Sequence, residues 1–274
     1  LNIALSLRAR LYDRPYYRLA YGDSDGLPGL VLDRYDDVVV AQITTAGMER
    51  LKGEIAGALQ KVLRPRALLF RNDSAARELE GLSAYVEPAF GDVPESVTVE
   101  EDGARFTVRP ATGQKTGWFY DQRPNRLRLQ AYVKGLRVLD VFSYVGAWGV
   151  HAARGGAAEV LCIDSSARAP EDIKLNAELN DVSERVRVER SDAFDALRPH
   201  ERSRQISRST APRDRKLRGD LRQGHHDEGA FMHAWVRQCQ PGFVDLLLTL
   251  HQEIEIEGTR TVRNGSNPPV SAFD

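Results

Sequence analysis

The stretch of sequence that decides the fold runs from Val138 to Gly149 and reads VLDVFSYVGAWG. It continues an apolar run that starts at Leu136, passes through a turn containing Gly146, and then shows a helical pattern that runs toward Gly155. In open parallel sheets, ligands bind outside the carboxyl ends of such strands. Gly146 has no Cβ to keep a ligand from the backbone, and the free N–H groups of a helix start favour a carboxylate. The stretch therefore predicts a strand, a ligand-binding turn and a helix.

The alternation of strand and helix continues after this stretch. Val160 to Ile163 indicates a second strand, residues 170–180 a helix, and Val186 to Val188 a third strand. Strands that alternate with helices are typical of a parallel sheet with crossover helices. The predicted fold class is therefore α/β, with a doubly wound, Rossmann-like domain.

A carboxylate belongs to each of the three predicted strands. Asp140 lies in the first, Asp164 ends the second, and Asp192 ends the third. An acid in the position of Asp164 can accept both hydroxyls of an adenosine ribose, and Asp192 can accept from an adenine amino group while Phe194 offers apolar contact. Each acid alone could instead be a helix cap or a solvated turn residue. Their repetition at one sheet edge favours a common adenosyl site.

Two classes of adenosyl cofactor compete for such a site. Nicotinamide dinucleotides need a G-x-G-x-x-G loop that lets the pyrophosphate reach the helix N-terminus. Here Ser143 and Tyr144 occupy the front of the turn and Trp148 the back, so a diphosphate would be crowded out. Asp140 would also repel a diphosphate but tolerate a cation. The turn therefore favours the sulfonium cofactor S-adenosylmethionine over NAD.

Residues 113–123, GQKTGWFYDQR, precede this domain. A phosphate-binding Walker loop has four residues between its first glycine and the Gly-Lys pair, so this spacing excludes one. The density of polar and aromatic residues beside a domain boundary favours a ligand-facing wall, because clefts between domains are frequent binding sites. The alternative is an ordinary β-turn and helix start with stacked aromatic rings.

The N-terminal half predicts a compact mixed α/β unit that is rich in hairpins. Leu30 to Leu32 and Val38 to Ile43 indicate two strands joined across a turn, and Asp102-Gly103 is a typical turn for a second hairpin. The other expected elements are a helix over residues 1–12, turns over 13–28, a helix over 51–63 and a strand over 67–70.

Four motifs together resemble those of a known family. They are DGLPGL at 25–30, RELEGL at 77–82, GQKTGWFYDQR at 113–123 and DVFSYVG at 140–146. From about residue 14 to residue 197 the chain is similar to the large-subunit ribosomal RNA cytosine-C5 methyltransferase I family. The resemblance implies a Rossmann-like class I methyltransferase domain after a smaller mixed α/β domain, with the family's N-terminal PUA domain absent here.

The strand-end argument and the resemblance together assign a cofactor site but no catalytic residue and no metal. The residues expected to bind S-adenosylmethionine are Gln114, Lys115, Thr116, Phe119, Asp121, Arg123, Asp140, Phe142, Ser143, Tyr144, Gly146, Asp164, Ser165, Asp192 and Ala193.

The resemblance ends near Arg198. The family continues with Asp-Pro-Pro and Ser-Cys-Ser motifs, and neither is present. Methylation of cytosine C5 needs a thiolate that adds to C6, and Cys239 precedes Pro241 instead of following a Pro-Gly turn, so it is not expected to be the nucleophile. A late strand is expected at Leu246 to Leu250. The loss of pattern favours a chain that is at least partly out of frame.

These observations divide the chain into three regions. Residues 1–112 form the hairpin-rich α/β domain, residues 113–198 the cofactor half of the methyltransferase domain, and residues 199–274 its atypical C-terminal part.

Composition limits the function classes. The chain has 274 residues and a formal net charge of −1, so RNA binding needs a local basic patch. Two cysteines suggest neither a disulfide framework nor a zinc site, and no apolar stretch is long enough to span a bilayer. We expect a cytoplasmic methyltransferase that acts on a base of large-subunit ribosomal RNA, without a membrane partner, and with a homodimer as one option. A methyltransferase of another substrate class and an inactive cofactor- or RNA-binding remnant stay open as alternatives.

Overall fold

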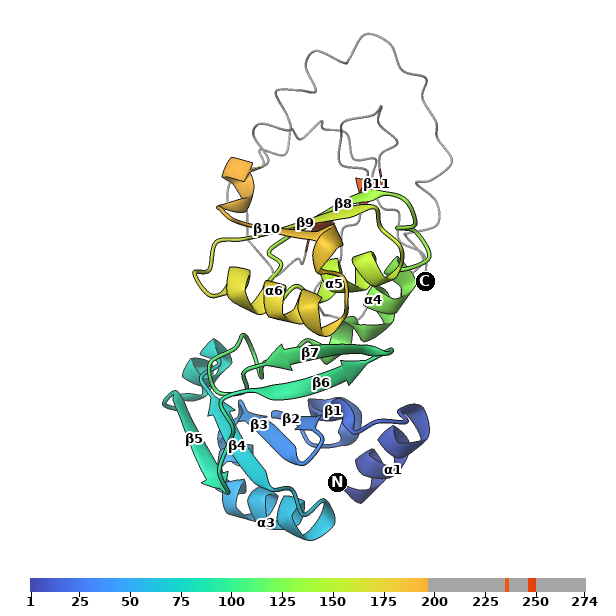
Figure 1. Ribbon diagram of the computed structural model, residues 1–274. Coiled ribbons are helices and arrows are strands. Elements are labelled where there is room, and N and C mark those ends of the chain that lie inside the picture. Colours follow the sequence, from blue (N-terminus) through green and yellow to red (C-terminus); the bar gives the residue numbers. More distant parts are fainter. Residues whose placement is uncertain (197–234, 237–245, 250–274) are drawn as a thin grey trace, which may run out of the picture.

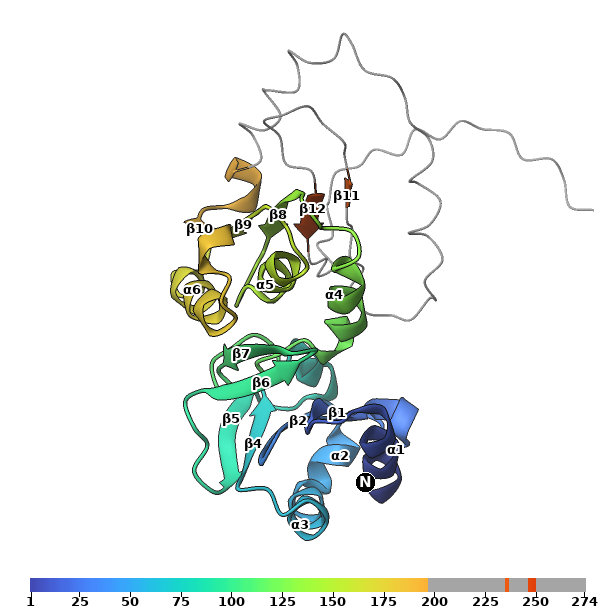
Figure 2. The same ribbon diagram turned by 45° about the vertical axis from the view of Figure 1, so that its right-hand side comes forward.

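The computed structural model describes residues 1–196, 235–236 and 246–249. These residues form an N-terminal part built on one five-stranded sheet and a C-terminal part built on another. The β6–β7 hairpin and the helices α4 to α6 lie between the two sheets in both views (Figures 1 and 2). No helix of this described part is long and apolar enough to cross a membrane.

The N-terminal sheet has the strand order β1-β2-β3-β4-β5. All neighbouring pairs are antiparallel except β3 and β4, which are parallel and joined by a helical crossover. The elements are α1 (Asn2–Leu11), β1 (Tyr16–Tyr21), β2 (Leu30–Tyr35), β3 (Val38–Ile43), α2 (Ala46–Arg50), α3 (Lys52–Val62), β4 (Ala67–Asn72) and β5 (Tyr85–Phe90).

The predicted hairpin, crossover helix and following strand are confirmed by β2, β3, α3 and β4. Two strands differ from the expectation. Strand β1 lies within residues 13–28, which were expected to be turns, because the turn formers flank an apolar core of YYRLAY. Strand β5 was not expected because its YVEPAF sequence contains Pro88 and lacks a buried face; it is an edge strand, where proline is tolerated.

The second predicted hairpin is confirmed by β6 (Val97–Glu101) and β7 (Ala104–Val108). Asp102 and Gly103 both have positive φ, 50° and 75°, as a two-residue hairpin turn requires. The buried side of this hairpin belongs to one apolar core that contains residues of the N-terminal sheet and of the C-terminal helices. The two halves of the protein therefore share a core through the hairpin.

The C-terminal sheet has the order β10-β9-β8-β12-β11 and is parallel except for β11. Its elements are α4 (Arg123–Leu129), β8 (Arg137–Val141), α5 (Ala147–Arg154), β9 (Glu159–Asp164), α6 (Ala169–Leu179), β10 (Val186–Arg190), β11 (Trp235–Val236) and β12 (Leu246–Thr249). The predicted series of strands and helices is confirmed, and so is the late strand, which pairs with β8.

Alternate residues of the parallel strands are buried on opposite faces. Val138 and Val160 pack into the core that contains α5 and α6, whereas Leu139, Val141 and Ile163 form a separate cluster on the other face. This two-sided burial is typical of a central parallel sheet.

Arg71 of β4 holds the segment that connects the two parts. Its guanidinium donates to the carbonyl oxygens of Pro110 and Gly113, each at 2.7 Å. Because Arg71 is buried, these bonds fix the start of segment 113–123 against the N-terminal sheet.

A second anchor joins the same segment to β2. The Thr116 hydroxyl donates to the carboxylate of Asp33, and the Tyr35 hydroxyl donates to the Thr116 carbonyl at 3.0 Å. Asp33 is fully buried and also accepts from Arg18 at 2.8 Å and 3.0 Å. Segment 113–123 is therefore anchored by charge-assisted hydrogen bonds inside the protein.

The Thr116 anchor predicts a loss of stability in Thr116→Val. This isosteric change leaves a buried carboxylate oxygen without its hydroxyl donor, which costs about 1–3 kcal/mol. Urea unfolding measures the difference. Thr98→Val, at an exposed position of β6, is the matched control and is expected to change the free energy of unfolding by less than about 0.5 kcal/mol. Equal effects of the two substitutions would contradict the anchoring role.

Candidate functional site

The turn after β8 is tied to the end of β9. Ser143 Oγ donates to the Asp140 carbonyl at 2.8 Å and accepts from Ile163 N at 3.0 Å. Tyr144 N donates to Asp164 Oδ2 at 2.9 Å. Phe142 and Tyr144 have positive φ, 59° and 54°, which is uncommon for residues with a side chain and is often found at binding sites.

The structure explains the glycine at position 146 differently from the expectation. Its φ is 78°, and a Cβ there would lie 2.9 Å from Ile173 Cγ2 of α6. Its own N–H donates to the Ser143 carbonyl at 2.7 Å. The absent side chain therefore makes room for α6 to pack behind the turn, and the structure gives it no contact with the pocket described below.

The three strand-end acids have three different environments. Asp164 is half-buried and accepts one backbone N–H at each oxygen, from Tyr144 at 2.9 Å and from Ser166 at 2.8 Å. Asp192 is exposed and accepts from the N–H groups of Phe194 and Asp195, so the capping alternative describes its contacts. Asp164 joins the end of β9 to the β8 turn.

Asp140 does not reach the sheet edge, which corrects the expectation that it lines the site with the other two acids. Its side chain is 1% exposed and lies on the α5 face of β8, where it accepts from Gly149 N at 3.0 Å. The pKa of Asp140 is raised to about 7: burial is the largest cause and the nearby Asp164 adds to it, against the lowering effect of the bonds from Gly149, Ser143 and Cys162. Asp140 therefore fastens α5 to the sheet.

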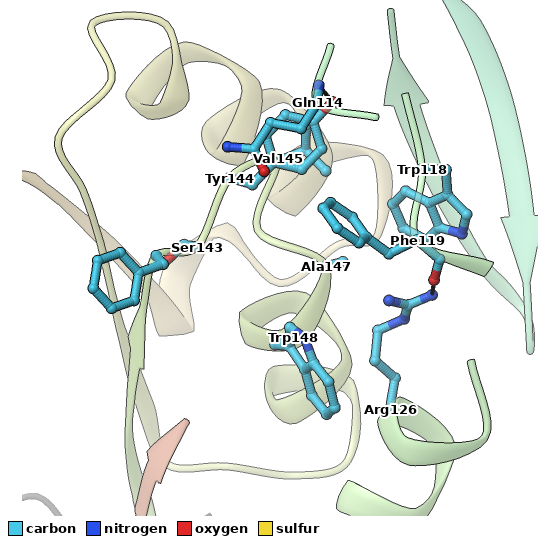
Figure 3. Close-up of a pocket in the computed structure, with 10 residues that line it drawn as sticks. Gln114, Trp118, Phe119, Arg126, Ser143, Tyr144, Val145, Ala147 and Trp148 are labelled. Atoms are coloured by element: carbon cyan, nitrogen blue, oxygen red, sulfur yellow. Dashed lines mark hydrogen bonds between the residues drawn. The ribbon is translucent and has the colours of Figure 1, made fainter. Parts of the chain in front are cut away.

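A small pocket lies between segment 113–123 and the β8 turn. Figure 3 shows Gln114 and Tyr144 on one side, Trp118 and Phe119 on another, and Trp148 with Arg126 on a third. Such a mixed aromatic and polar lining is typical of small-molecule sites. Its residues are Gln114, Trp118, Phe119, Arg126, Phe142, Ser143, Tyr144, Val145, Ala147 and Trp148.

Tyr144 holds the two walls of this pocket together. Its hydroxyl donates to the Gly117 carbonyl at 3.1 Å and accepts from Gln114 N at 3.0 Å. Burial raises the pKa of Tyr144 to about 12, so the hydroxyl keeps its proton at neutral pH. Phe119 packs edge-on against the same ring, and Lys115 Nζ lies 4.6 Å from the centre of the Phe119 ring.

Several expected site residues do not line the pocket. Thr116 is fully buried against the N-terminal sheet, and Arg123 pairs with Asp102 at 2.8 Å and lies over the Tyr12 ring. Ala193 packs into the cluster on the opposite face of the C-terminal sheet. Asp121 and Ser165 are exposed and outside the lining, and Lys115, Asp164 and Asp192 do not belong to the lining either. Polar residues within one motif thus point in different directions.

Five lining residues were absent from the expected set: Trp118, Arg126, Val145, Ala147 and Trp148. Arg126 makes two hydrogen bonds to Glu101 of β6, at 2.6 Å and 2.7 Å, and lies between the rings of Trp118 and Trp148. Despite burial, which acts in the opposite direction, Arg126 and His151 lower the pKa of Glu101 to about 2. The two tryptophans stand inside the stretches 113–123 and 138–149 and could have been found there, whereas nothing local to Arg126 indicates its distant partner.

Asp140 predicts a pH-dependent stability. Its pKa rises from the ordinary value of 3.8 to about 7 in the fold, so its stabilising contribution is complete below pH 3.8 and is lost as the pH rises to about 7. The loss is on the order of 4 kcal/mol. Urea unfolding between about pH 4.5 and pH 7.5 should show a shallower decline in Asp140→Asn, which keeps an acceptor for Gly149 N.

The pKa of Glu101 is lowered from 4.5, so the stability that Glu101 contributes changes only below about pH 4.5, outside that window. Parallel pH profiles of the wild-type protein and Asp140→Asn would contradict the role given to Asp140.

Comparison with known proteins agrees with this geometry. Residues 63–191 match the family described as S-adenosylmethionine-dependent methyltransferase. The chain is 41% identical over 187 residues to ribosomal RNA large subunit methyltransferase I of Aeromonas hydrophila. The matched residues cover 67% of this chain and 47% of that protein. The chain thus spans about half the length of the curated relatives it matches.

Two solved structures are also similar. One, described as an S-adenosylmethionine-dependent methyltransferase from Streptococcus mutans, has a TM-score of 0.64 and 25% identity, covering 73% of this chain and 53% of that one. The other, a methyltransferase complexed with S-adenosylhomocysteine, has a TM-score of 0.65 and 25% identity, covering 74% and 53%. The predicted Rossmann-like class I methyltransferase fold is confirmed. The chain is a relative of the large-subunit ribosomal RNA methyltransferase I proteins, the family that its motifs resemble, and the cofactor of its wider family is S-adenosylmethionine.

Proposed function

We propose that this chain binds S-adenosylmethionine in the pocket between segment 113–123 and the β8 turn, and that it transfers the methyl group to a base of large-subunit ribosomal RNA. The observation that carries the proposal is the double attachment of Tyr144, whose N–H binds Asp164 and whose hydroxyl binds Gln114 and Gly117. Through Tyr144, the strand-end acid Asp164 is tied to a turn and an aromatic wall that line one pocket. The similarity to ribosomal RNA large subunit methyltransferase I supports the substrate.

The donors and acceptors in and beside the pocket support the proposed cofactor. Each oxygen of Asp164 accepts one backbone N–H, which leaves lone pairs for the two ribose hydroxyls. The start of α5 offers N–H groups for the carboxylate of the amino-acid end. Phe119 and Tyr144 give the apolar surface that an uncharged thioether or a sulfonium carbon chain needs. The bound cofactor would supply an electrophilic methyl group.

Five of the other expected cofactor residues are proposed in two groups. Phe142, Ser143 and Gln114 line the pocket and would contact the cofactor directly. Thr116 and Arg123 would act by holding segment 113–123 in place.

The RNA substrate is proposed to present an extruded base, because an enzyme cannot reach a base atom inside a stacked helix. The proposed location is the cytoplasm, which follows from ribosomal RNA as the proposed substrate. We do not assign a catalytic side chain.

A second candidate function is cofactor binding without transfer to cytosine C5. It is favoured by Cys162, the cysteine within the described residues, which is fully buried. Burial raises the pKa of its thiol well above the ordinary value, so Cys162 does not provide the thiolate that C5 chemistry needs. Cys239 lies outside the described residues, as do the positions where the family has Asp-Pro-Pro and Ser-Cys-Ser. The nucleotide sequence tests the proposed frameshift: an alternative frame after residue 198 should restore both motifs.

Calorimetric titration with S-adenosylmethionine tests the cofactor site. We expect Asp164→Ala to weaken binding by about tenfold or more, because it removes the ribose acceptor and the partner of Tyr144 N. Glu184→Ala removes one exposed carboxylate from the turn before β10 and is the matched control. Equal affinity of Asp164→Ala and the wild-type protein would refute the ribose assignment.

Transfer of a tritiated methyl group distinguishes the candidate functions. Incorporation into large-subunit ribosomal RNA supports the leading proposal. Cofactor binding with no incorporation supports the second candidate, and incorporation into small molecules but not RNA assigns the chain to another substrate class.

A further inference from the structure

The indole N–H of Trp148 is buried and has no partner within the part of the chain that the structure describes. Trp148 is 5% exposed and lines the pocket, and its Nε1 has no hydrogen-bond acceptor among the described residues. Trp118 lines the same pocket, but its Nε1 donates to Glu101 at 3.1 Å. The two tryptophans therefore differ: among the described residues, the donor of Trp118 has an acceptor and that of Trp148 has none.

An unpaired buried donor is uncommon in native proteins, because the group gives up its hydrogen bond to water and gains nothing in return. Packing does not explain the nitrogen, since a phenylalanine could fill much of the same apolar space beside Ala147 and Arg126. An unpaired donor in a pocket wall is explained if the ligand carries its acceptor.

The surroundings of Trp148 admit a carboxylate acceptor, and the helix start favours one. Arg126, its neighbour in the pocket wall, is paired with Glu101, which remains ionised because its pKa is about 2. This pair is neutral as a whole and repels neither a carboxylate nor an ammonium group. Trp148 is the second residue of α5, where backbone N–H groups have no acceptor inside the helix and the helix dipole favours a negative charge.

We propose that Trp148 Nε1 donates a hydrogen bond to the carboxylate of the amino-acid end of the bound cofactor, and that Trp148 thereby selects ligands that carry this end. The inference rests on the proposed function, since it assumes that the adenosyl end lies toward Asp164. The turn from Tyr144 to Trp148 then contacts both ends of one ligand: Tyr144 is bound to Asp164, and Trp148 lies at the helix start (Figure 3).

Two ligands separate this role from general packing. S-adenosylhomocysteine carries the amino-acid end, and 5′-methylthioadenosine has the same adenosyl thioether without it. In Trp148→Phe we expect the affinity for S-adenosylhomocysteine to fall about tenfold, as for a lost hydrogen bond to a charged group. The affinity for 5′-methylthioadenosine should stay within about twofold. The ratio of the two affinities is measured in one preparation, so a partly unfolded sample lowers both and leaves the ratio unchanged.

Trp118→Phe is the matched variant for stability. Both variants lose the packing of a buried indole, but Trp118→Phe also removes an N–H that is bonded to Glu101, so its unfolding temperature should fall further than that of Trp148→Phe. A Trp148→Phe protein with an unchanged affinity ratio, or with both affinities lowered equally, overturns the inference while leaving the proposed function standing. A wild-type protein that binds neither ligand overturns both.

Discussion

The pocket depends on one side chain that is attached at both ends. The backbone of Tyr144 is held by Asp164 at the end of β9, and its hydroxyl is held by Gln114 and Gly117 on the opposite wall. Its positive φ directs the ring across the gap between them. Without the hydroxyl, segment 113–123 would keep its anchors on the N-terminal sheet and its packing through Trp118, but it would lose the hydrogen bonds that join it to the β8 turn.

The N-terminal sheet therefore belongs to the site even though none of its residues lines the pocket. Arg71 and Asp33 hold segment 113–123 from behind, and Glu101 of the hairpin holds Arg126. These are buried charged groups with several hydrogen bonds each, and such networks are costly to leave half-satisfied. The arrangement sets the position of an aromatic wall whose own residues have little freedom to move.

Much of this organisation could be predicted from the sequence, because it follows local rules. Asp102-Gly103 identified the β6–β7 turn by its need for positive φ, and the stretch around Gly146 identified the strand, turn and helix. The direction of each side chain was harder to predict. Asp140 stands two residues after Val138, so the period of a strand places both on the α5 face, even though the acid's place in its motif favours the sheet edge.

Other features depend on contacts between distant segments. Thr116 and Gln114 are two residues apart in one polar motif, yet one is buried against β2 and the other lines the pocket. Arg126 is a core residue only because Glu101 neutralises it from another element. Strand β5 forms because β4 offers an edge, not because its own pattern calls for a strand. No local pattern carries this information.

The shared hairpin has a consequence for dividing the polypeptide. A cut near residue 112 falls between the two sheets in sequence, yet Val99, Phe106 and Val108 pack in one core with Trp118 and Val150 from beyond the cut. Separate expression of the first half would expose the apolar side of β6–β7 to water. The second half would lose the surface that covers α5 and α6. The natural unit for expression, or for split-protein complementation, is the hairpin together with both of its neighbours.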